Sequence, residues 1–382
     1  RSAAVSGRRV LFICNVDWFV LMHWRDLLAD MVGRGHSVTV MCANTGRIGE
    51  IEAIGVEVEA LPMSRAGTSP LAELRSLSRI IRGVRRVRPE LVHTVTIKPN
   101  LYGTLAVRLA TRRTPVVCAV TGFGFLLDAE ASGPLSRVIR GVLRVVFRSS
   151  RVHVQVENRE ALQQVIDRGL ATRSRTHLIE GAGVDTERFR PRSVDEGPSG
   201  PVTVLLSSRM LRDKGVVEFV EAARILGQRS DIRFLLAGRL DIDGNPTALT
   251  EAELDELLEG TGVTWLGEVD DLDLLLREVE IVALPSYHEG LPKALLEAAA
   301  SGLPLIASDI AGCRPVVVPD QNGLLVPPRD PVALAAAVES LAADAELRAR
   351  FGARSRRLAI ERFDRRIILE GFATLHDQVV AQ

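Results

Sequence analysis

Lysine is nearly absent from this chain of 382 residues. Of its 48 basic residues all but three are arginine, and the exceptions are Lys98, Lys214 and Lys293. Arginine carries a wide planar fork and lysine a compact charge on a flexible stem, so the two are not interchangeable where one donor must reach one oxygen. Chance survival would explain the small number of lysines. Chance explains their placement poorly, since each lies in a segment that looks like a site, at 96–99, 209–215 and 289–297.

Other scarcities exclude whole classes of function. Aromatic residues make up only 4% of the chain, which argues against stacking platforms for single-stranded nucleic acid. The four cysteines are scattered, with no CxxC pair and no Cys/His cluster, which fits a reducing cytosol and no structural zinc. They are Cys14, Cys42, Cys118 and Cys313.

No apolar run reaches the ~20 residues that a membrane-spanning helix needs. The segment after Arg8 and Arg9 resembles a signal peptide superficially, but Asn15 and Asp17 interrupt its apolar run. A buried first strand at 10–14 explains it better. We therefore expect a cytoplasmic protein, peripheral on the inner face of the cell membrane.

The net charge is zero, but the charge is unevenly distributed. Residues 1–190 carry 28 basic and 17 acidic side chains, and the remainder carries 20 and 31. The first half therefore has a net charge of +11 and the second of −11. Such asymmetry indicates an anionic surface or partner for the first half.

Short apolar runs alternate with longer amphipathic ones along the chain, a pattern typical of parallel sheets covered by helices on both faces. The pattern breaks at 185–200, where prolines and glycines mix with charges, and then restarts. We expect two tandem doubly wound, Rossmann-like α/β domains that face each other across a cleft. Residues 1–190 would form the first domain and 191–382 the second, with the last helix free to pack back on the first.

The segment 284–297 carries the clearest site signal. A strand is expected to end at Leu284, and a helix to start at Pro292, a residue that suits the first helical turn. The N–H groups of Gly290 and Leu291 lie near this helix start, which is a favourable place for an anion. Glu289 precedes the helix and Glu297 lies on it, eight residues later. The alternative is a surface loop with a solvated glutamate.

These residues resemble the signature of the family-4 retaining glycosyltransferases, which have the GT-B fold. A glutamate, seven residues and a second glutamate lie within a strand, loop and helix. Residues 207–223 look like the donor-phosphate segment of that family, and 181–185 look like its interdomain turn. Residues 91–103 are similar to a subgroup of bacterial N-acetylhexosaminyltransferases that act on polyprenyl-diphosphate-linked glycans.

The resemblance implies roles for the donor residues in the second domain. Arg209 and Lys214 would neutralise the donor diphosphate, Glu289 would contact the sugar hydroxyls, and Glu297 the ribose. Gly290, Leu291 and Pro292 would form the phosphate-binding helix start. The alternative for 209–214 is an ordinary helix start capped by Asp213.

The resemblance places the acceptor in the first domain. His93 is expected from the sequence itself to end a strand beside Thr94, Thr96 and Lys98. This polar company indicates an acceptor role and a part in catalysis with Arg209, Lys214 and Glu289. The alternative, which is the default for a lone histidine, is a core residue bonded to a backbone carbonyl. Asn15, Lys98, Thr121 and Gly122 complete the acceptor set. Thr121 occupies the place of a family histidine and cannot act as a base, which favours a route in which the donor phosphate takes the acceptor proton.

No metal site is expected. A metal-dependent GT-A transferase needs an Asp-x-Asp motif, which Asp241-Ile242-Asp243 formally provides. A turn signal follows it, and two tandem sheets are wrong for that fold. We therefore interpret this segment as a loop.

Residues 135–149 predict contact with an anionic membrane. Arg137, Arg140, Arg144 and Arg148 recur among apolar residues at helical spacing, as in helices that lie on membrane surfaces. Residues 75–88 add six arginines. The alternative is a pair of helices with solvated arginine faces.

The sequence thus predicts transfer of a sugar, an N-acetylhexosamine in the favoured version, from a UDP-sugar to a polyprenyl-diphosphate-linked or other glycan. Two alternatives stay open. One is transfer to a soluble natural-product acceptor. The other is a non-catalytic protein that binds membrane or nucleic acid.

Overall fold

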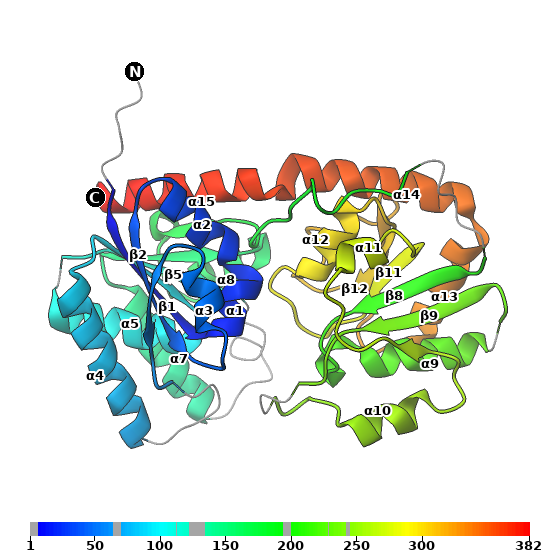
Figure 1. Cartoon of the computed structure of the whole chain (residues 1–382), viewed down its shortest axis with the longest axis horizontal. Helices are drawn as coiled ribbons and strands as arrows, with labels where there is room; N and C mark the ends of the chain where they lie inside the picture. Colours follow the sequence, from blue (N-terminus) through cyan, green and yellow to red (C-terminus); the bar gives the residue numbers. More distant parts are fainter. Residues whose placement is uncertain are drawn as a thin grey trace. The chain divides into compact units, whose positions relative to one another are not determined.

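The computed structural model describes residues 7–63, 70–111, 113–121, 134–193, 200–227, 229–241 and 245–382, with backbone alone at 70 and 134–140. The chain divides into two compact units. Residues Arg1–Ala182 and Arg366–Gln382 form the first, and Gly183–Arg365 form the second. Figure 1 shows the elements of each unit.

The first unit is built on a seven-stranded parallel sheet in the order β3-β2-β1-β4-β5-β6-β7. Its strands are β1 (Arg9–Val16), β2 (Ser37–Ala43), β3 (Glu57–Ala60), β4 (Leu91–Val95), β5 (Val116–Val120), β6 (Val152–Val156) and β7 (Thr176–Leu178). Its helical elements are α1 (Asp17–His23), α2 (Arg25–Gly33), α3 (Ile48–Glu52), α4 (Pro70–Val87), α5 (Ile97–Ala110), α7 (Pro134–Phe147), α8 (Arg159–Asp167), the 3₁₀ turn η1 (Arg173–Arg175) and, from Arg366, the C-terminal α15 (Arg365–Val380).

Helices cover both faces of this sheet. On one face α4, α5, α7 and α8 pack over a core that includes Leu11, Ile13 and Val154. On the other, α1, α2, α3 and α15 pack over Val10 and Phe12. Alternate residues of β1 thus enter opposite cores, which explains why its apolar run is continuous.

The second unit is a six-stranded parallel sheet in the order β10-β9-β8-β11-β12-β13. Its strands are β8 (Val202–Ser207), β9 (Ile232–Ala237), β10 (Thr264–Trp265), β11 (Ile281–Leu284), β12 (Leu305–Ser308) and β13 (Gly323–Val326). Its helical elements are α9 (Val216–Leu226), α10 (Glu251–Leu258), α11 (Leu272–Leu275), α12 (Lys293–Ala300), α13 (Pro331–Ala343), α14 (Ala345–Leu358), the 3₁₀ turn η2 (Arg212–Lys214) and the π-helical turn η3 (Ala359–Phe363).

The predicted fold class of two parallel α/β sheets is confirmed. In both sheets the strand order reverses beside the first strand of the unit, between β1 and β4 and between β8 and β11. Ligands of such sheets bind beyond the carboxyl ends of the strands at this switch point. Within the described residues, no helix combines the length and hydropathy needed to cross a bilayer.

Candidate active site

Two loops meet at the switch point of the second unit. Residues 208–215 follow β8, and residues 285–292 follow the neighbouring strand β11. Gly215 has a φ of +73°, and a Cβ atom there would lie 2.2 Å from the carbonyl oxygen of Pro285. Only glycine accommodates both this backbone conformation and this close approach. The glycine therefore allows the two loops to touch.

Lys214 and Glu289 form an ion pair across these loops. Nζ of Lys214 lies 2.5 Å from Oε1 of Glu289, and Ser286 Oγ donates to the same oxygen over 2.8 Å. The side chains are 23% and 10% exposed. Two residues 75 positions apart in the sequence thus place a cation and a carboxylate together at the ligand-binding edge of the sheet.

Arg209 lies on the loop after β8 and pairs with Asp241. The Asp241 side chain is fully buried, whereas that of Arg209 is 20% exposed. Asp241 follows the end of β9, so the buried carboxylate holds the arginine at the same edge of the sheet. The formal Asp-x-Asp motif thus supplies the partner of Arg209, while Asp243 lies outside the described residues.

Helix α12 begins at Lys293, one residue later than predicted, and Pro292 is its N-cap in an extended conformation. Glu297 lies on this helix and is buried. Burial raises the pKa of Glu297, and the charges of Lys293 and Arg188 offset part of that effect. Nζ of Lys293 lies 3.6 Å from Oε1 of Glu297. The helix therefore places the second carboxylate beside Lys293, the first residue of α12.

Three residues of this region are not among the site residues predicted from the sequence. Ser286 and Asp241 hold Glu289 and Arg209 by the contacts above. Gly312 is the third, since a Cβ atom there would lie 2.3 Å from the carbonyl oxygen of Glu289. Ser286 and Asp241 each follow the end of a strand, and this position was the signal available in the sequence. The alternative in which Asp213 caps α9 is wrong, because Gly215 is the N-cap.

The acceptor residues predicted for the first unit occupy different positions. Asn15 is in β1 and Thr121 directly follows β5, and both are partly exposed. Lys98 is in the first turn of α5, and its Nζ lies 2.7 Å from Oε1 of Glu73 on α4. Asn15 and Lys98 therefore flank the switch point between β1 and β4. Gly122 lies outside the described residues.

The prediction that His93 ends its strand is wrong. His93 is the middle residue of β4 and is fully buried. Its ring stacks on Phe12 with centroids 5.1 Å apart, and its Nδ1 lies 3.1 Å from Nε2 of His376. Burial and the neighbouring His376 hold the pKa of His93 well below its ordinary value. An enclosed, neutral imidazole is a core residue, so we withdraw its assignment to catalysis and acceptor binding.

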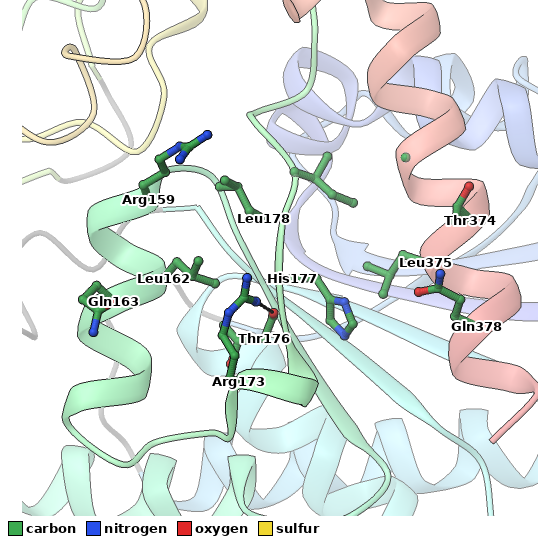
Figure 2. Close-up of a pocket in the computed structure, with 12 residues that line it drawn as sticks. Arg159, Leu162, Gln163, Arg173, Thr176, His177, Leu178, Thr374, Leu375 and Gln378 are labelled. Carbon is green, nitrogen blue, oxygen red and sulfur yellow. Dashed lines mark hydrogen bonds between the residues drawn. The ribbon is translucent and has the colours of Figure 1, made fainter.

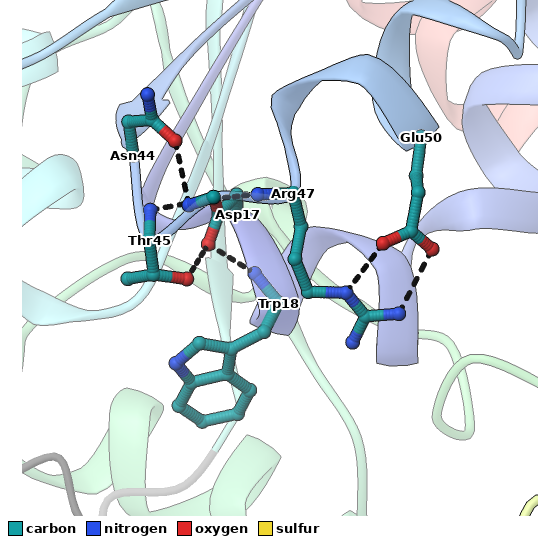
Figure 3. Close-up of polar contacts among 7 residues, drawn as sticks. Asp17, Trp18, Asn44, Thr45, Arg47 and Glu50 are labelled. Carbon is teal, nitrogen blue, oxygen red and sulfur yellow. Dashed lines mark hydrogen bonds and ion pairs between the residues drawn. The ribbon is translucent and has the colours of Figure 1, made fainter.

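Asp17 organises the loops at the switch point of the first unit. Its buried carboxylate accepts hydrogen bonds from the N–H groups of Trp18, Thr45 and Arg47 and from the Thr45 hydroxyl (Figure 3). Burial raises the pKa of Asp17, but these hydrogen bonds outweigh burial and hold it below its ordinary value. Asp17 thus fastens the loop after β2 to the start of α1, two residues from Asn15.

One pocket of the first unit contains none of the predicted residues. It has a volume of about 730 Å³ and lies along the edge strand β7, between α8 and α15 (Figure 2). Leu162, Leu178 and Leu375 form apolar parts of its wall, and Arg159 and Arg173 also line it. Its position on an edge strand separates it from the switch point between β1 and β4.

Part of the apolar side of α7 is taken up by the core, which reduces the surface that the helix predicted at 135–149 offers to a membrane. Leu143, Val146 and Phe147 are buried in the core against the sheet. Arg144 and Arg148 are exposed, as are Val142 and Val145, while the side chains of Arg137 and Arg140 lie outside the described residues. The described part of the helix therefore covers the sheet with one face and leaves Val142 and Val145 exposed beside the arginines.

Comparison with known proteins gives matches in both halves of the chain. A family model described as "Glycosyl transferase 4-like" matches residues 9–153, and one described as "Glycosyl transferases group 1" matches residues 189–358. The described residues contain no cluster of three or more histidine, cysteine or acidic side chains suited to a metal ion.

Two relatives and two solved structures are similar over most of the chain. N,N'-diacetylbacillosaminyl-diphospho-undecaprenol alpha-1,3-N-acetylgalactosaminyltransferase of Campylobacter jejuni is 26% identical over 94% of this chain and 96% of its own. UDP-Gal:alpha-D-GlcNAc-diphosphoundecaprenol alpha-1,3-galactosyltransferase of Escherichia coli is 23% identical over 76% of each chain. Among solved structures, HepE of Anabaena, in complex with UDP and glucose, superposes with a TM-score of 0.77 at 20% identity, covering 97% of this chain and 99% of its own. Sucrose-phosphate synthase of Thermosynechococcus elongatus superposes with a TM-score of 0.80 at 20% identity over 98% and 100%.

Proposed function

Because this chain belongs to the group 1 glycosyltransferases of family 4, with the GT-B fold, we propose that it transfers an N-acetylhexosamine from a UDP-sugar to a hydroxyl of a polyprenyl-diphosphate-linked glycan, with retention of configuration. Membership of the family makes it an enzyme that transfers a sugar from a nucleotide-sugar. The sugar, the nucleotide and the acceptor are the parts that we propose.

The Lys214–Glu289 pair at the switch point of the second unit is the observation that carries the proposal. A lysine suits a phosphate oxygen as a point charge, and a carboxylate accepts hydrogen bonds from sugar hydroxyls. A nucleotide-sugar carries both groups, joined through its diphosphate. The pair therefore has the chemistry to hold a donor at the bond that breaks.

Charge stabilisation is the main contribution that we assign to the second unit. When the glycosidic bond breaks, negative charge develops on the departing nucleoside diphosphate. Lys214 and Arg209 would stabilise that charge, together with the N–H groups at the start of α12. Under this proposal the protein itself supplies the positive charge that a metal ion supplies in other transferases.

The acceptor proton has no assigned base in the first unit. His93 is buried and Thr121 cannot accept a proton at neutral pH, so a donor phosphate oxygen would take it. Asn15 and Lys98 remain the proposed acceptor-binding residues, on either side of the switch point between β1 and β4.

The names of the relatives support the finer choices. The two homologues above are named for undecaprenyl-diphosphate-linked acceptors, one of them as an N-acetylgalactosaminyltransferase and the other as acting with UDP-Gal. HepE is described in complex with UDP and glucose. These names favour a UDP-linked donor and a lipid-linked acceptor over a soluble aglycone.

The test is release of UDP from UDP-N-acetylhexosamine in the presence of a lipid-linked acceptor extract. Lys214→Ala and Arg209→Ala should each lose most of the turnover while the fold persists. Arg224→Ala is the control, since Arg224 is exposed on α9 and pairs with Glu221. Near-normal rates in both site variants would contradict the donor assignment. Full activity on soluble acceptors alone would favour the natural-product alternative.

Membrane docking is the second part of the proposal, and α4 supports it more than α7. Arginines at 75, 79, 82, 85, 86 and 88 are exposed, and Leu71 and Leu74 near the start of α4 are 68% and 63% exposed. Basic residues near an anionic surface contribute about 1 kcal/mol each. Exposed leucines beside them can enter the interface. Helix α7 would add only its exposed arginines and valines.

Vesicle sedimentation tests this docking. Wild type should bind anionic vesicles and release them at high salt, because screening weakens surface charge interactions. Two variants should each bind less than wild type. One carries glutamine at 137, 140, 144 and 148, and the other combines Leu71→Ser with Leu74→Ser. Arg229→Gln in the second unit serves as control. Unchanged binding in both variants would refute the membrane proposal.

A further inference from the structure

Tyr287 links the two loops that meet at the switch point of the second unit. Its N–H donates to the carbonyl oxygen of Asp213 over 2.8 Å, and its hydroxyl donates to Oε1 of Glu218 over 2.5 Å. Asp213 belongs to η2, and Glu218 to the first turn of α9. Tyr287, in the loop after β11, thus ties that loop to both elements that follow β8.

The hydrogen bond between Tyr287 and Glu218 offsets the cost of burying the Glu218 carboxylate. Glu218 is 8% exposed, and its Oε2 has no hydrogen-bond partner among the residues that the structure describes. A buried carboxylate that loses a partner bears the full cost of desolvation. The guanidinium of Arg329 lies 4.5 Å from the centroid of the Tyr287 ring, where cation–π attraction favours the observed ring position.

These contacts surround the ion pair of the candidate active site. Asp213 and Glu218 lie on either side of Lys214 in the sequence, and Tyr287 precedes Glu289 by two residues. Gly215 packs against the backbone of Pro285 in the same region. A movement of the loop that separated Tyr287 from Glu218 would therefore also displace Glu289 from Lys214.

We propose that Tyr287 and Glu218 are positioning residues, which hold Glu289 and Lys214 in the arrangement that the donor sugar requires. This inference rests on the proposed function, since that function gives the ion pair its task. Tyr287 and Glu218 act through Glu289 and Lys214 and do not touch the donor. Small misplacements at a reacting centre reduce the rate strongly, because they remove alignment already built into the site.

The experiment compares Tyr287→Phe, Glu218→Ala and Glu218→Gln in donor turnover. Tyr287→Phe and Glu218→Ala should lower kcat about tenfold and change KM for the UDP-sugar less than about threefold, as expected when a hydrogen bond to a charged group is lost from the aligned state. Glu218→Gln keeps an acceptor oxygen and should retain most of the rate. The double variant Tyr287→Phe/Glu218→Ala should be no slower than either single variant, because both remove the same bond.

Tyr102→Phe is the matched control, because Tyr102 is the other tyrosine of the chain and its pKa is also raised by burial and by a neighbouring glutamate, Glu73, in the first unit. Amide hydrogen exchange at residues 285–291 gives a readout that needs no substrate. Exchange should accelerate there in Tyr287→Phe, and remain as in wild type in Tyr102→Phe.

The outcomes separate this proposal from the proposed function. Wild-type kcat and wild-type exchange in Tyr287→Phe would overturn the positioning role, and so would additive losses in the double variant. Lys214→Ala is the reference in the same assay. If Lys214→Ala loses its rate and Tyr287→Phe does not, the positioning role alone is wrong. If Lys214→Ala and Arg209→Ala both keep their rates, the donor assignment is wrong, and the exchange data still decide whether Tyr287 fixes the loop.

Discussion

Replacing Asp17 by asparagine should destabilise the first unit, and the size of the loss follows from the hydrogen bonds that the Asp17 carboxylate accepts. Oδ1 of Asp17 accepts from Trp18 and the Thr45 hydroxyl, and Oδ2 accepts from the N–H groups of Thr45 and Arg47. Asparagine can keep the first pair, but its amide group would face the second pair of donors (Figure 3). Each hydrogen bond to a charged group contributes roughly 1.5–3 kcal/mol. An amide is less costly to bury than a carboxylate, so we expect a net loss of about 2–4 kcal/mol.

Urea unfolding followed by tryptophan fluorescence measures this loss. Two of the three tryptophans, Trp18 and Trp24, are in the first unit, and Trp18 is itself bonded to Asp17. The pKa of Asp17 is lowered in the folded state from an ordinary value of 3.8. Its stabilising contribution is therefore complete above that pH and is lost as the pH falls through the lower, folded-state pKa.

The pH dependence of the stability difference tests this reasoning. The difference between wild type and Asp17→Asn should be constant from pH 7 to pH 5 and should shrink below the ordinary pKa. Glu52→Gln on α3 is the control, since Glu52 is exposed, and it should unfold as wild type does. Equal urea midpoints for Asp17→Asn and wild type at pH 7 would show that the network contributes no stability.

Three further outcomes are expected. Glu289→Gln should lower kcat more than Glu297→Gln, because contacts to the reacting sugar can tighten in the transition state whereas contacts to ribose do not. Steady-state kinetics measures the two kcat values, and a change in KM alone for Glu289→Gln would contradict this ranking. EDTA should leave turnover unchanged, and a loss restored by Mn²⁺ would revive a metal role for Asp241. Phe372→Ala should destabilise the first unit by about 3–5 kcal/mol in urea unfolding, because this side chain of α15 is buried in the core with 1% of its surface exposed. An unchanged urea midpoint would show that α15 does not complete that core.

The sheets could be predicted because their strands carry the information themselves. Every residue of β4, β5 and β6 is buried, so each strand appears in the sequence as a short, mainly apolar run, continuous in β5 and interrupted by histidine, threonine or glutamine in the other two. Loop residues at strand ends were partly predictable, because the strands that precede them can be recognised in the sequence. Lys214 and Glu289 each follow a recognisable strand, but their contact depends on strand order, which the resemblance to a family supplied and local pattern did not.

The errors concern residues whose environment comes from distant segments. His93 is enclosed partly by Phe372 and His376 of α15, and its contact with His376 spans 283 positions. No local pattern reveals such a partner. Helix α7 shows the same limit, because an apolar helical face looks identical in sequence whether it covers a sheet or a membrane. Only the contacts of Leu143 and Phe147 with the core distinguish the two.

Both donor-site cations have carboxylate partners in the chain itself, and this affects how a donor could bind. Arg209 is held by the buried Asp241, whereas the partner of Lys214 is Glu289. Under the proposed function, a diphosphate that draws Lys214 toward its oxygens removes the counter-charge of Glu289. A carboxylate with 10% exposed surface then needs new hydrogen-bond donors, and the hydroxyls of the transferred sugar supply them. A nucleotide that lacks the sugar leaves Glu289 without that compensation. Binding of the diphosphate and recognition of the sugar would thus be coupled through one ion pair, and Glu289→Gln should reduce the difference in affinity between the nucleotide-sugar and the free nucleotide.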